Sequence, residues 1–500
     1  MTHERDRSLA RRFAPLIGVL SGFVMLVATA RCAKSGPIPA VGSTTLRVGI
    51  GGLPQLTPQA GVQQFIGNLS TEGLIAPYED GRPRPWLAES WSLASNGLVL
   101  TVRLRPKARF HDGTPVTASI VVQVLQSVLP NLMGPTFQED VDKIVALDDT
   151  QVQIQLRQPS HFLLEALETA IRKPAGKTTL GTGPYEPEAD SSSQLESNKN
   201  YYLGRPTIER IVTQTYPTIR TAWAELLRGN LDMLYEVNID ALDSLQRSSN
   251  VSVFSYLRHY QYVIMFGDRA PVFKAPSVRR ELNAALDRDA IVRDVLNGHG
   301  IPSIGPVPPQ HWALEKFAPR IGFNPILAKS LAARRLRFTC LVAADSLYER
   351  IALAVKQQLA AASVDMQVQE VTQDQIIQAG HSRSYEALLI DVVSGPSMFR
   401  SFRHFYSKAP FDLKPVGNAA IDNTLDRIRH ASSDDEYTRG VTAFQQAIVD
   451  DPPEVFLVWA ERARAVSRRF DVSEAEGGRD VLNTLRLWRP VTVQQLASRN

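Results

Sequence analysis

Cysteine is almost absent from this 500-residue chain, which contains only Cys32 and Cys340. Two cysteines are too few for the disulfide framework that stabilises many small exported domains. Cys340 stands in an apolar run, 338–342, and we expect it to be a buried strand residue. The fold must therefore be stabilised by its own hydrophobic core.

A strong charge of either sign is also lacking. Lysine and arginine number 55, and aspartate and glutamate number 51, which gives a formal net charge of +4 at pH 7. No basic stripe with interleaved aromatic residues occurs, so we expect no nucleic-acid partner. Hydrophobic residues make up 44% and charged residues 21% of the chain. These values indicate a soluble globular protein with two or three domains or two large lobes.

Local signatures of catalysis, cofactor binding and metal binding are missing. Gly181-Thr182-Gly183 is not followed by the Lys-Ser/Thr of a phosphate-binding loop, and Glu186 occupies the third glycine position of a dinucleotide motif. No nucleophile elbow, S-x-x-K or H-E-x-x-H occurs, and none of the nine histidines has metal-ligand spacing. We therefore predict no enzymatic activity, no cofactor and no metal site. A hydrolase assembled from distant residues stays open as an alternative.

The N-terminus carries an export pattern. Four arginines within residues 1–12 precede an uncharged stretch, 13–30, which ends in Ala28-Thr29-Ala30. This order is typical of a signal peptide over 1–30, and an uncleaved membrane anchor is the alternative. Cys32 is a candidate lipidation residue, although Arg31 stands where a lipobox has a small residue. We predict an exported protein at the periplasmic or extracytoplasmic face of the cell membrane, with a linker over 31–45.

Alternating apolar and polar residues predict several strands. The pattern indicates strands at 46–50 and 98–105, and a hairpin over 144–156 with Asp-Asp at its turn. The polar, serine-rich segment 189–199 is expected to be a surface loop. Strands of this kind occur along most of the chain rather than in one block.

Helical spacing alternates with these strands. Thr117, Ser160 and Ser277 each precede apolar residues at helical spacing and can cap a helix, the second of which is expected to end near Ile171. A helix over 349–362 runs into alternating residues, and this helix-then-strand pattern recurs over 373–390. Interleaved elements indicate a mixed α/β fold rather than separate all-α and all-β halves.

The segment Arg109–Ala118 contains the pair His111-Asp112, which could belong to a metal site or a catalytic dyad. Turn chemistry offers another interpretation. Asp112-Gly113 is a turn pair, because the aspartate accepts backbone N–H groups and the glycine adopts unusual backbone angles. Pro115 fixes the chain just before the expected cap at Thr117. We predict a structural corner between a strand and a helix.

Several short blocks form an ordered set along residues 46–460. They are Leu56-Thr57-Pro58, Glu72-Gly73-Leu74, Pro85-Trp86-Leu87-Ala88-Glu89-Ser90-Trp91, Leu104-Arg105 with Phe110-His111-Asp112-Gly113-Thr114-Pro115, Gly181-Thr182-Gly183-Pro184-Tyr185, Arg228-Gly229-Asn230-Leu231-Asp232, Val278-Arg279-Arg280-Glu281-Leu282 with Ala285-Leu286-Asp287-Arg288, and Asn418-Ala419-Ala420-Ile421-Asp422. Together they resemble the extracellular solute-binding proteins of family 5, the large binding proteins of peptide and nickel ABC importers.

The resemblance implies an α/β fold with two lobes, similar to periplasmic binding proteins of type II in the peptide-binding cluster, with an additional inserted lobe. Lobe I is expected to contain 46–70, 180–258 and 471–500, the inserted lobe II 71–179, and lobe III 259–470. In such a fold the lobes close on a ligand about a hinge, and the closed form docks onto a membrane permease. We expect the protein itself to be a monomer.

The chain departs from the family in one region. Peptide-binding members carry a Gly-Trp pair followed by an aspartate, which pairs with the amino terminus of the peptide. Residues 391–397 contain no tryptophan, and the nearest acid, Asp391, lies several residues early. Burial of an ammonium group without a carboxylate partner is costly. The sequence therefore disfavours the binding of peptides through a free amino terminus.

Candidate ligand-binding residues follow from their position in the segments that resemble the family. They are Gln64, Tyr260, Tyr262, Asp391, Ser394, Gly395, Ser397, Arg400 and His404. The two tyrosines could form aromatic walls or belong to the strand core. The serines and the glycine could present hydroxyl and backbone groups or form an ordinary loop. The arginine and the histidine could bind an anion or form a solvated face.

The predicted function is that of the substrate-binding component of an ABC importer, which captures an oligopeptide or peptide-like solute. Its expected partners are that small solute, the permease subunits, and the membrane surface through a lipid or N-terminal anchor. A modified peptide, a glycoconjugate or another small solute is an alternative ligand. An alternative function is that of a regulatory or scaffold protein of the cell envelope, which keeps the fold without transport.

Overall fold

The structure is a computed structural model, and it describes residues 43–52, 58–176, 178–188, 191–410, 415–472 and 480–492. The predicted export segment, Cys32 and most of the predicted linker lie outside the described residues. Within the described part of the chain, no helix is long and apolar enough to span a membrane.

One 11-stranded sheet organises most of the fold. Its strands, in spatial order, are β10 (Tyr185–Pro187), β11 (Gln194–Ser197), β12 (Arg210–Tyr216), β1 (Thr45–Gly51), β13 (Met233–Val237), β19 (Glu454–Ser467), β14 (Val251–Phe266), β18 (Ala387–Val393), β16 (Arg337–Ala343) and β17 (Asp365–Val371), with β15 (Gly300–Pro302) paired to β19. Strand β1 is parallel to β12 and β13, and β16 is parallel to β17 and β18. The presence of β11 corrects the loop predicted over 189–199, because the fully buried Leu195 anchors a strand there.

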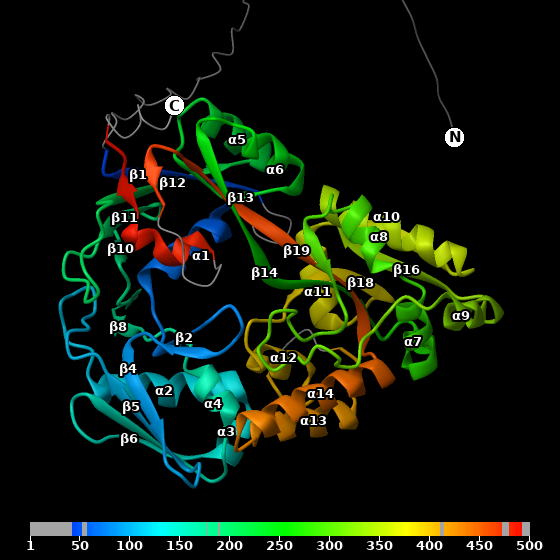
Figure 1. The fold of residues 1–500 in the computed structure, drawn as a ribbon, viewed down its shortest axis with the longest axis horizontal. Coiled ribbons are helices and arrows are strands. Elements are labelled where there is room, and N and C mark those ends of the chain that lie inside the picture. The colour runs from blue at the N-terminus through cyan, green and yellow to red at the C-terminus, as the bar shows by residue number, and fades with distance from the viewer. Residues whose placement is uncertain are drawn as a thin grey trace, which may run out of the picture. The chain divides into compact units, whose positions relative to one another are not determined.

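Strands β14 and β19 are long enough to belong to both halves of this sheet, and they run side by side in Figure 1. Residues 251–257 of β14 pair with 461–467 of β19, and residues 261–265 pair with 454–459. Between these two ladders β14 has more residues than β19, so Arg258–Tyr260 bulge outward. We call the half of the sheet from β10 to β13 lobe I and the half from β18 to β17 lobe III. The two strands connect these lobes.

Lobe I is covered on both faces of its sheet. The helix α1 (Pro58–Ser70) and the 3-10 segment η3 (Val481–Leu487) pack on one face, in a core that includes Phe65, Leu485 and the buried side chains of β1. The helices α5 (Ile219–Leu227) and α6 (Ile239–Gln246) pack on the other face. A strand buried on both faces is typical of a parallel sheet between helices.

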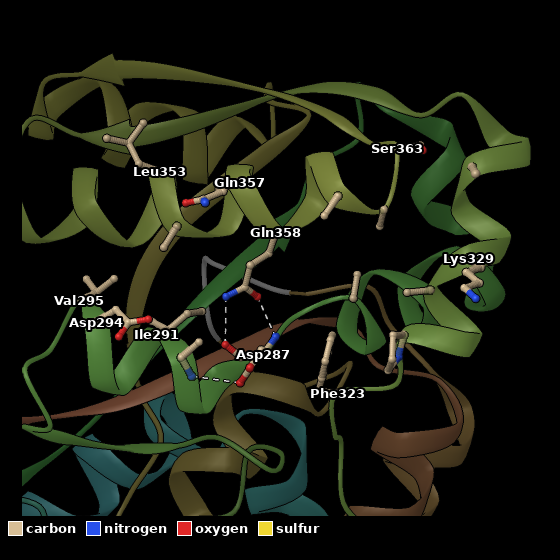
Figure 2. A pocket seen from close by; sticks show the side chains of 18 of the residues that line it. Asp287, Ile291, Asp294, Val295, Phe323, Lys329, Leu353, Gln357, Gln358 and Ser363 are labelled. Carbon is tan, nitrogen blue, oxygen red and sulfur yellow. Dashed lines mark hydrogen bonds between the residues drawn. The ribbon is translucent and has the colours of Figure 1, made fainter.

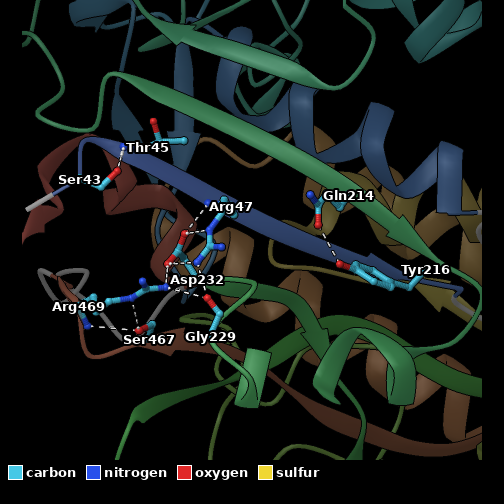
Figure 3. Close-up of polar contacts among 9 residues, drawn as sticks. All are labelled: Ser43, Thr45, Arg47, Gln214, Tyr216, Gly229, Asp232, Ser467 and Arg469. Carbon is cyan, nitrogen blue, oxygen red and sulfur yellow. Dashed lines mark hydrogen bonds and ion pairs between the residues drawn. The ribbon is translucent and has the colours of Figure 1, made fainter. Parts of the chain in front are cut away.

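Asp232 locks the edge between β1 and β13 in lobe I (Figure 3). Its buried carboxylate accepts hydrogen bonds from the backbone N and the Nε of Arg47, each 2.9 Å away, and from Nη2 of Arg469. Arg47 Nη2 also donates to Gly229 O, 2.6 Å away. Gly229 has a φ of +77°, which a side chain would disfavour. The Gly-x-x-Asp block of the sequence therefore has a structural role in joining strands.

The part of the chain between α1 and β10, which we call lobe II, contains a separate four-stranded sheet of β4 (Ala88–Leu93), β5 (Val99–Leu104), β7 (Gln151–Leu156) and β6 (Val141–Ala146). The helix α2 (Ala118–Met133) covers it, followed by α3 (Pro135–Asp140) and α4 (His161–Ala166). The hairpin predicted over 144–156 is confirmed as β6 and β7. The prediction that the helix after Ser160 ends near Ile171 is wrong. The chain leaves the helix at Ala166, and Ile171 N instead donates to Glu72 O.

Lobe II also packs on lobe III. Phe162 of α4 lies with its ring centroid 4.9 Å from that of Phe402, and 6.2 Å from that of Phe399. Both partners belong to α12 (Met398–Phe405) of lobe III. One hydrophobic core runs through the two lobes. Lobe II is therefore fixed to lobe III by apolar packing, as well as to lobe I by its chain connections.

Lobe III confirms the two predicted helix-then-strand units. The helix α10 (Ser346–Ala361) leads to β17, and α11 (Gln373–Ser382) leads to β18. Cys340 is fully buried in β16, as predicted. The cap predicted at Ser277 is wrong, because Ala275 is the N-cap and Pro276 begins the helix, where a missing N–H costs nothing.

The remaining elements are short or lie at the periphery of the lobes. They are α7 (Pro276–Ala284), α8 (Arg288–Asp294), α9 (Pro325–Ala328), α13 (Ala419–Arg429), α14 (Asp434–Asp450), η1 (Pro271–Lys274), η2 (Lys329–Arg334), and the paired strands β2 (Ile75–Pro77) with β3 (Pro83–Pro85), β8 (Lys173–Ala175) with β9 (Thr178–Leu180), and β20 (Phe470–Asp471) with β21 (Arg489–Pro490).

The segment Arg109–Ala118 forms the predicted corner. Asp112 Oδ1 accepts hydrogen bonds from the backbone N and Oγ1 of Thr114, at 3.0 and 2.6 Å, and Gly113 has a φ of +81°. Thr117 caps α2 through its side chain. His111 faces the chain that enters lobe I, since its backbone N donates to Gly181 O at 3.0 Å.

His111→Ala is expected to lower the free energy of unfolding by about 1–2 kcal/mol, because Gly183 O loses the imidazole Nε2 that lies 3.1 Å away. The corner lies outside the cavities described below, so ligand affinity should not change. Urea unfolding and calorimetric titration of the same preparation would measure both quantities. A large loss of affinity in a fully folded variant would contradict this structural role.

Candidate ligand-binding site

Two adjoining cavities lie where the lobes meet beside β14 and β19. The smaller cavity, of about 240 Å³, is lined by the bulge Arg258–Tyr260, and we call it the hinge cavity. The larger cavity, of about 690 Å³, is bordered by α1, by residues 168–172 and by residues 480–486, and we call it the side cavity. The residues common to both are Gln64, Asn68, His259, Asp480 and Asn483. Together the two cavities form one cleft between the lobes.

The bulge of β14 brings three side chains to the hinge cavity. Arg258 stacks on Tyr260, with its guanidinium carbon 3.6 Å from the ring centroid, and its Nη1 lies 3.3 Å from Asp391 Oδ2. The carbonyl of His259 accepts a hydrogen bond from Ser394 N at 3.0 Å, which holds the end of β18 beside the bulge. At Gly395 an added Cβ would lie 2.7 Å from Pro308 Cγ. Glycine therefore permits this close approach.

Paired charges form the floor of the hinge cavity. Arg462 Nε lies 3.1 Å from Glu236 Oε1, and the Nη2 of Arg462 donates to Tyr262 Oη at 2.8 Å. Arg464, two residues along β19, donates to Asp480 through Nε at 3.0 Å and lies 4.2 Å from the ring centroid of Tyr235. Residues two apart on a strand face the same side, so both arginines point toward the cleft wall. These carboxylates are therefore already neutralised by the protein.

Glu72 is a buried carboxyl group at the edge of the side cavity. Tyr201 Oη and Trp86 Nε1 donate to its Oε1 at 2.5 and 2.8 Å, and Thr182 Oγ1 donates to its Oε2 at 2.9 Å. Burial raises the pKa of Glu72 to about 7, although these hydrogen bonds act in the opposite direction. At neutral pH this group is therefore only partly charged.

Four of the sequence-predicted residues line the cleft. Gln64 lines both cavities and accepts a hydrogen bond from Tyr235 Oη at 3.2 Å. Tyr260 and Gly395 line the hinge cavity, and Arg400 lines the side cavity. The Nη2 of Arg400 forms an ion pair with Glu168. These four residues come from both lobes and line the one cleft that the two cavities form.

The structure buries the other five candidates outside the lining of the two cavities, and their role in ligand binding stays a prediction. They are Tyr262, Asp391, Ser394, Ser397 and His404, all of them buried. The tyrosine packs in the core of lobe III, and the histidine lies 3.2 Å from the buried carboxylate of Glu454. The aspartate is held by Arg258. Cys32, the predicted lipidation residue, lies outside the described residues.

Sequence reasoning missed the residues on which the cleft depends most. Arg258 and His259 follow no recognisable motif, because their exposure to the cleft results from the register shift between β14 and β19. Arg464 and Asp480 are brought together by the return of the C-terminal segment to lobe I. Glu72 belongs to the block Glu72-Gly73-Leu74, but that block gives no sign of the hydrogen-bond donors around the carboxyl group, which include Tyr202 Oη at 3.2 Å.

A separate cavity of about 950 Å³ lies on lobe III beside α8, α9 and α10 (Figure 2). Gln358 spans it by accepting a hydrogen bond from Asp287 N at 2.7 Å and donating to Asp287 O at 3.1 Å. All of its lining residues lie within 285–363, so closure of the lobes would not enclose a ligand there. Across the described residues, no group of three or more His, Cys, Asp or Glu side chains is arranged to hold a metal ion.

Residues 82–411 match the bacterial extracellular solute-binding proteins, family 5, in the middle part of that family. The match covers more than half of the chain, which therefore belongs to this family of solute-binding proteins. The chain is 23% identical over 453 residues to the oligopeptide-binding protein AppA of Bacillus subtilis (strain 168), covering 80% of this chain and 83% of AppA. It is 24% identical over 405 residues to the probable D,D-dipeptide-binding periplasmic protein DdpA of Escherichia coli (strain K12), covering 74% of this chain and 78% of DdpA.

Solved structures confirm the two-lobed fold class. The fold is similar to that of NikZ from Campylobacter jejuni in complex with Ni(L-His), with a TM-score of 0.76 at 20% identity, over 89% of this chain and 99% of NikZ. It is also similar to AppA from Bacillus subtilis in complex with a nonapeptide, with a TM-score of 0.74 at 23% identity, over 91% of this chain and 100% of AppA.

Proposed function

We propose that this protein is the substrate-binding component of an ABC importer, and that it captures an oligopeptide or peptide-like solute between its lobes for delivery to a membrane permease. The observation that carries the proposal is the cleft beside the two strands that connect lobes I and III. Lobes joined by such connections can close about a hinge. The relatives AppA and DdpA, named for oligopeptide and D,D-dipeptide binding, support a ligand of this class.

The lining of the cleft suits a polar, extended solute. Amide side chains of Gln64, Asn68 and Asn483 offer both donors and acceptors, and the ring of Tyr260 offers an apolar wall. Such a mixture of amides and aromatic surface can hold a peptide backbone without forming a bond to it. The proposed role is binding without chemistry.

We extend the proposal to the cellular setting. Relatives of this family act outside the cytoplasm, and the N-terminal pattern favours export with attachment through Cys32 or through an uncleaved segment 13–30. We propose that the protein works as a monomer on the outer face of the membrane. The lobe boundaries given from the sequence are kept as the proposed division of the chain.

A thermal-shift titration tests the binding role. A ligand that binds the folded state alone stabilises it by about 2.7 kcal/mol at a free concentration of about 100 times Kd. We therefore expect the unfolding temperature to rise with concentration for some members of a broad peptide and metabolite library. If no member shifts the transition of a folded, ligand-stripped preparation, the importer role is contradicted, and a scaffold role in the cell envelope is favoured instead.

A further inference from the structure

Arginines lie beside Glu236 and Asp480, two of the three acidic residues that line the hinge cavity, and beside Asp391 behind its wall. The third acidic lining residue is Glu79. Asp391 lies beside Arg258, and the acceptor atom Oδ2 is 3.3 Å from Nη1. Glu236 and Asp480 are matched by the two arginines of β19 described above. A cationic ligand group that used Asp391 would have to displace a guanidinium from a buried ion pair, which is strongly unfavourable. Asp391 is therefore poorly placed to bind a free ammonium group.

The side cavity has an excess of arginine among its described residues. Its lining contains Arg84, Arg172, Arg400 and Arg486 against three carboxyl groups. Of these carboxyl groups, Glu168 pairs with Arg400 and Asp480 pairs with Arg464. The third carboxyl, Glu72, is buried among its own hydrogen-bond donors. None of these three carboxyl groups forms an ion pair with Arg172 or Arg486.

Two of these arginines have a guanidinium group that is available to bind an anionic ligand. Arg172 is exposed at the rim, and Arg486 donates to Leu203 O at 3.4 Å, which is an uncharged acceptor. Neither forms an ion pair with another described residue. Arg172 belongs to lobe II and Arg486 to the η3 segment of lobe I, and both line the side cavity. A closing movement of the lobes would bring a ligand between them.

From this arrangement we infer that the cleft selects an anionic solute, a peptide-like molecule whose carboxylates reach Arg172 and Arg486 in the side cavity, without any need for a free amino terminus. The inference rests on the proposed function and adds a ligand class to it. Guanidinium groups bind carboxylates through two parallel hydrogen bonds, which gives direction as well as charge. Partial enclosure by the lobes strengthens such pairs over those in open solvent.

Calorimetric titration of the ligand-stripped, full mature chain tests the inference with three libraries of N-acetylated tripeptides. In these libraries the varied positions hold only Asp and Glu, only Asn and Gln, or only Lys and Arg. We expect the acidic library to bind about tenfold or more tightly than the amide library, since each charged pair adds this much. Removal of the acetyl group should change the affinity less than about twofold, which corresponds to about 0.4 kcal/mol or less at about 1.4 kcal/mol per tenfold.

Charge-removing variants connect the effect to the two arginines. Arg172→Gln and Arg486→Gln should each lower the affinity for the acidic library about tenfold, and leave the affinity for the amide library unchanged. The matched control is Arg220→Gln, which removes the same charge from an exposed position on α5 outside the cleft. This control should bind all the libraries as the unchanged protein does.

The outcomes separate the inference from the proposed function. Equal or tighter binding of the amide or basic libraries would overturn the anionic selectivity while solute binding stands. Unchanged affinity for the acidic library in both arginine variants would also overturn it, and circular dichroism confirms that the variants are folded. If neither the libraries nor a small-molecule extract of cells binds at all, both the inference and the proposed function fail.

Discussion

Replacement of Arg462 by methionine is expected to lower the free energy of unfolding by about 3–5 kcal/mol, one of the largest effects of any single substitution in this protein. Arg462 is buried on β19, where that strand passes from one lobe to the other. Methionine is nearly as long and keeps much of the packing. It leaves the buried carboxylate of Glu236, otherwise 3.1 Å from Arg462 Nε, without its ion-pair partner.

A double variant separates the effect of the unpaired charge on stability from the effect of the changed packing. Glu236→Gln removes the stranded charge, so the pair of substitutions together should destabilise the protein less than Arg462→Met alone. Urea unfolding followed by tryptophan fluorescence gives the free energies by linear extrapolation. A loss below about 1 kcal/mol for Arg462→Met would show that this ion pair does not hold the connecting strands. The same titrations report whether the transition stays cooperative.

The second large effect is a pH-dependent stability term from Glu165, where lobe II meets lobe III. Glu165 Oε1 accepts a hydrogen bond from Tyr437 Oη at 2.7 Å, and its Oε2 accepts one from Phe399 N at 2.8 Å. Burial raises the pKa of Glu165 to about 7, against these hydrogen bonds, which lower it. The folded state therefore binds the proton of this carboxyl group more tightly than the unfolded state does.

The sign of this contribution follows from linkage. The stabilisation is complete below the unfolded pKa of about 4.5 and is lost as pH rises to the folded pKa of about 7. Its size is about 3 kcal/mol, since one pKa unit corresponds to about 1.4 kcal/mol. Glu165→Gln stays neutral, so the stability of this variant relative to the unchanged protein should rise by about 3 kcal/mol between about pH 4.5 and pH 8.

Other titrating groups cancel in this comparison. Burial lowers the pKa of His161 and of His311, whose rings lie near Tyr437, so both histidines favour the folded state less as pH falls. They are present in both proteins and drop out of the difference to first order. Glu370→Gln, at an exposed position on β17, is the matched control. Parallel pH profiles for Glu165→Gln and the unchanged protein would contradict the buried, proton-binding carboxyl.

The elements of this fold that follow from short-range patterns could be predicted from the sequence. The alternation around β1 and β5, the hairpin of β6 and β7 and the capping at Thr117 all depend on neighbouring residues. Two of the wrong predictions of secondary structure also have identifiable causes. The helix near Ser277 begins earlier than predicted, at Pro276, because proline suits the first helical position. The strand β11 forms within a polar segment because it pairs with β12.

The cleft was less predictable, because its geometry arises from contacts between distant parts of the chain. The exposure of Arg258 depends on the register of β14 against β19, and its partner Asp391 is 133 residues away. Arg172 and Arg486 share a cavity although they belong to different lobes. The predicted residue Arg400 lies at the cleft, on the helix α12 that follows β18. His404 lies one turn later on the same helix and is buried.

We expect the cleft to hold one small solute per chain. Native mass spectrometry tests it on protein purified without denaturation, and on the same protein after denaturation, refolding and incubation with a small-molecule extract of the source culture. We expect one added mass at one molecule per chain, which the refolded protein regains and which fragmentation identifies as a carboxylate-bearing, peptide-like molecule. A refolded, cooperative protein that gains no mass from the extract or from the acidic peptides would contradict the account.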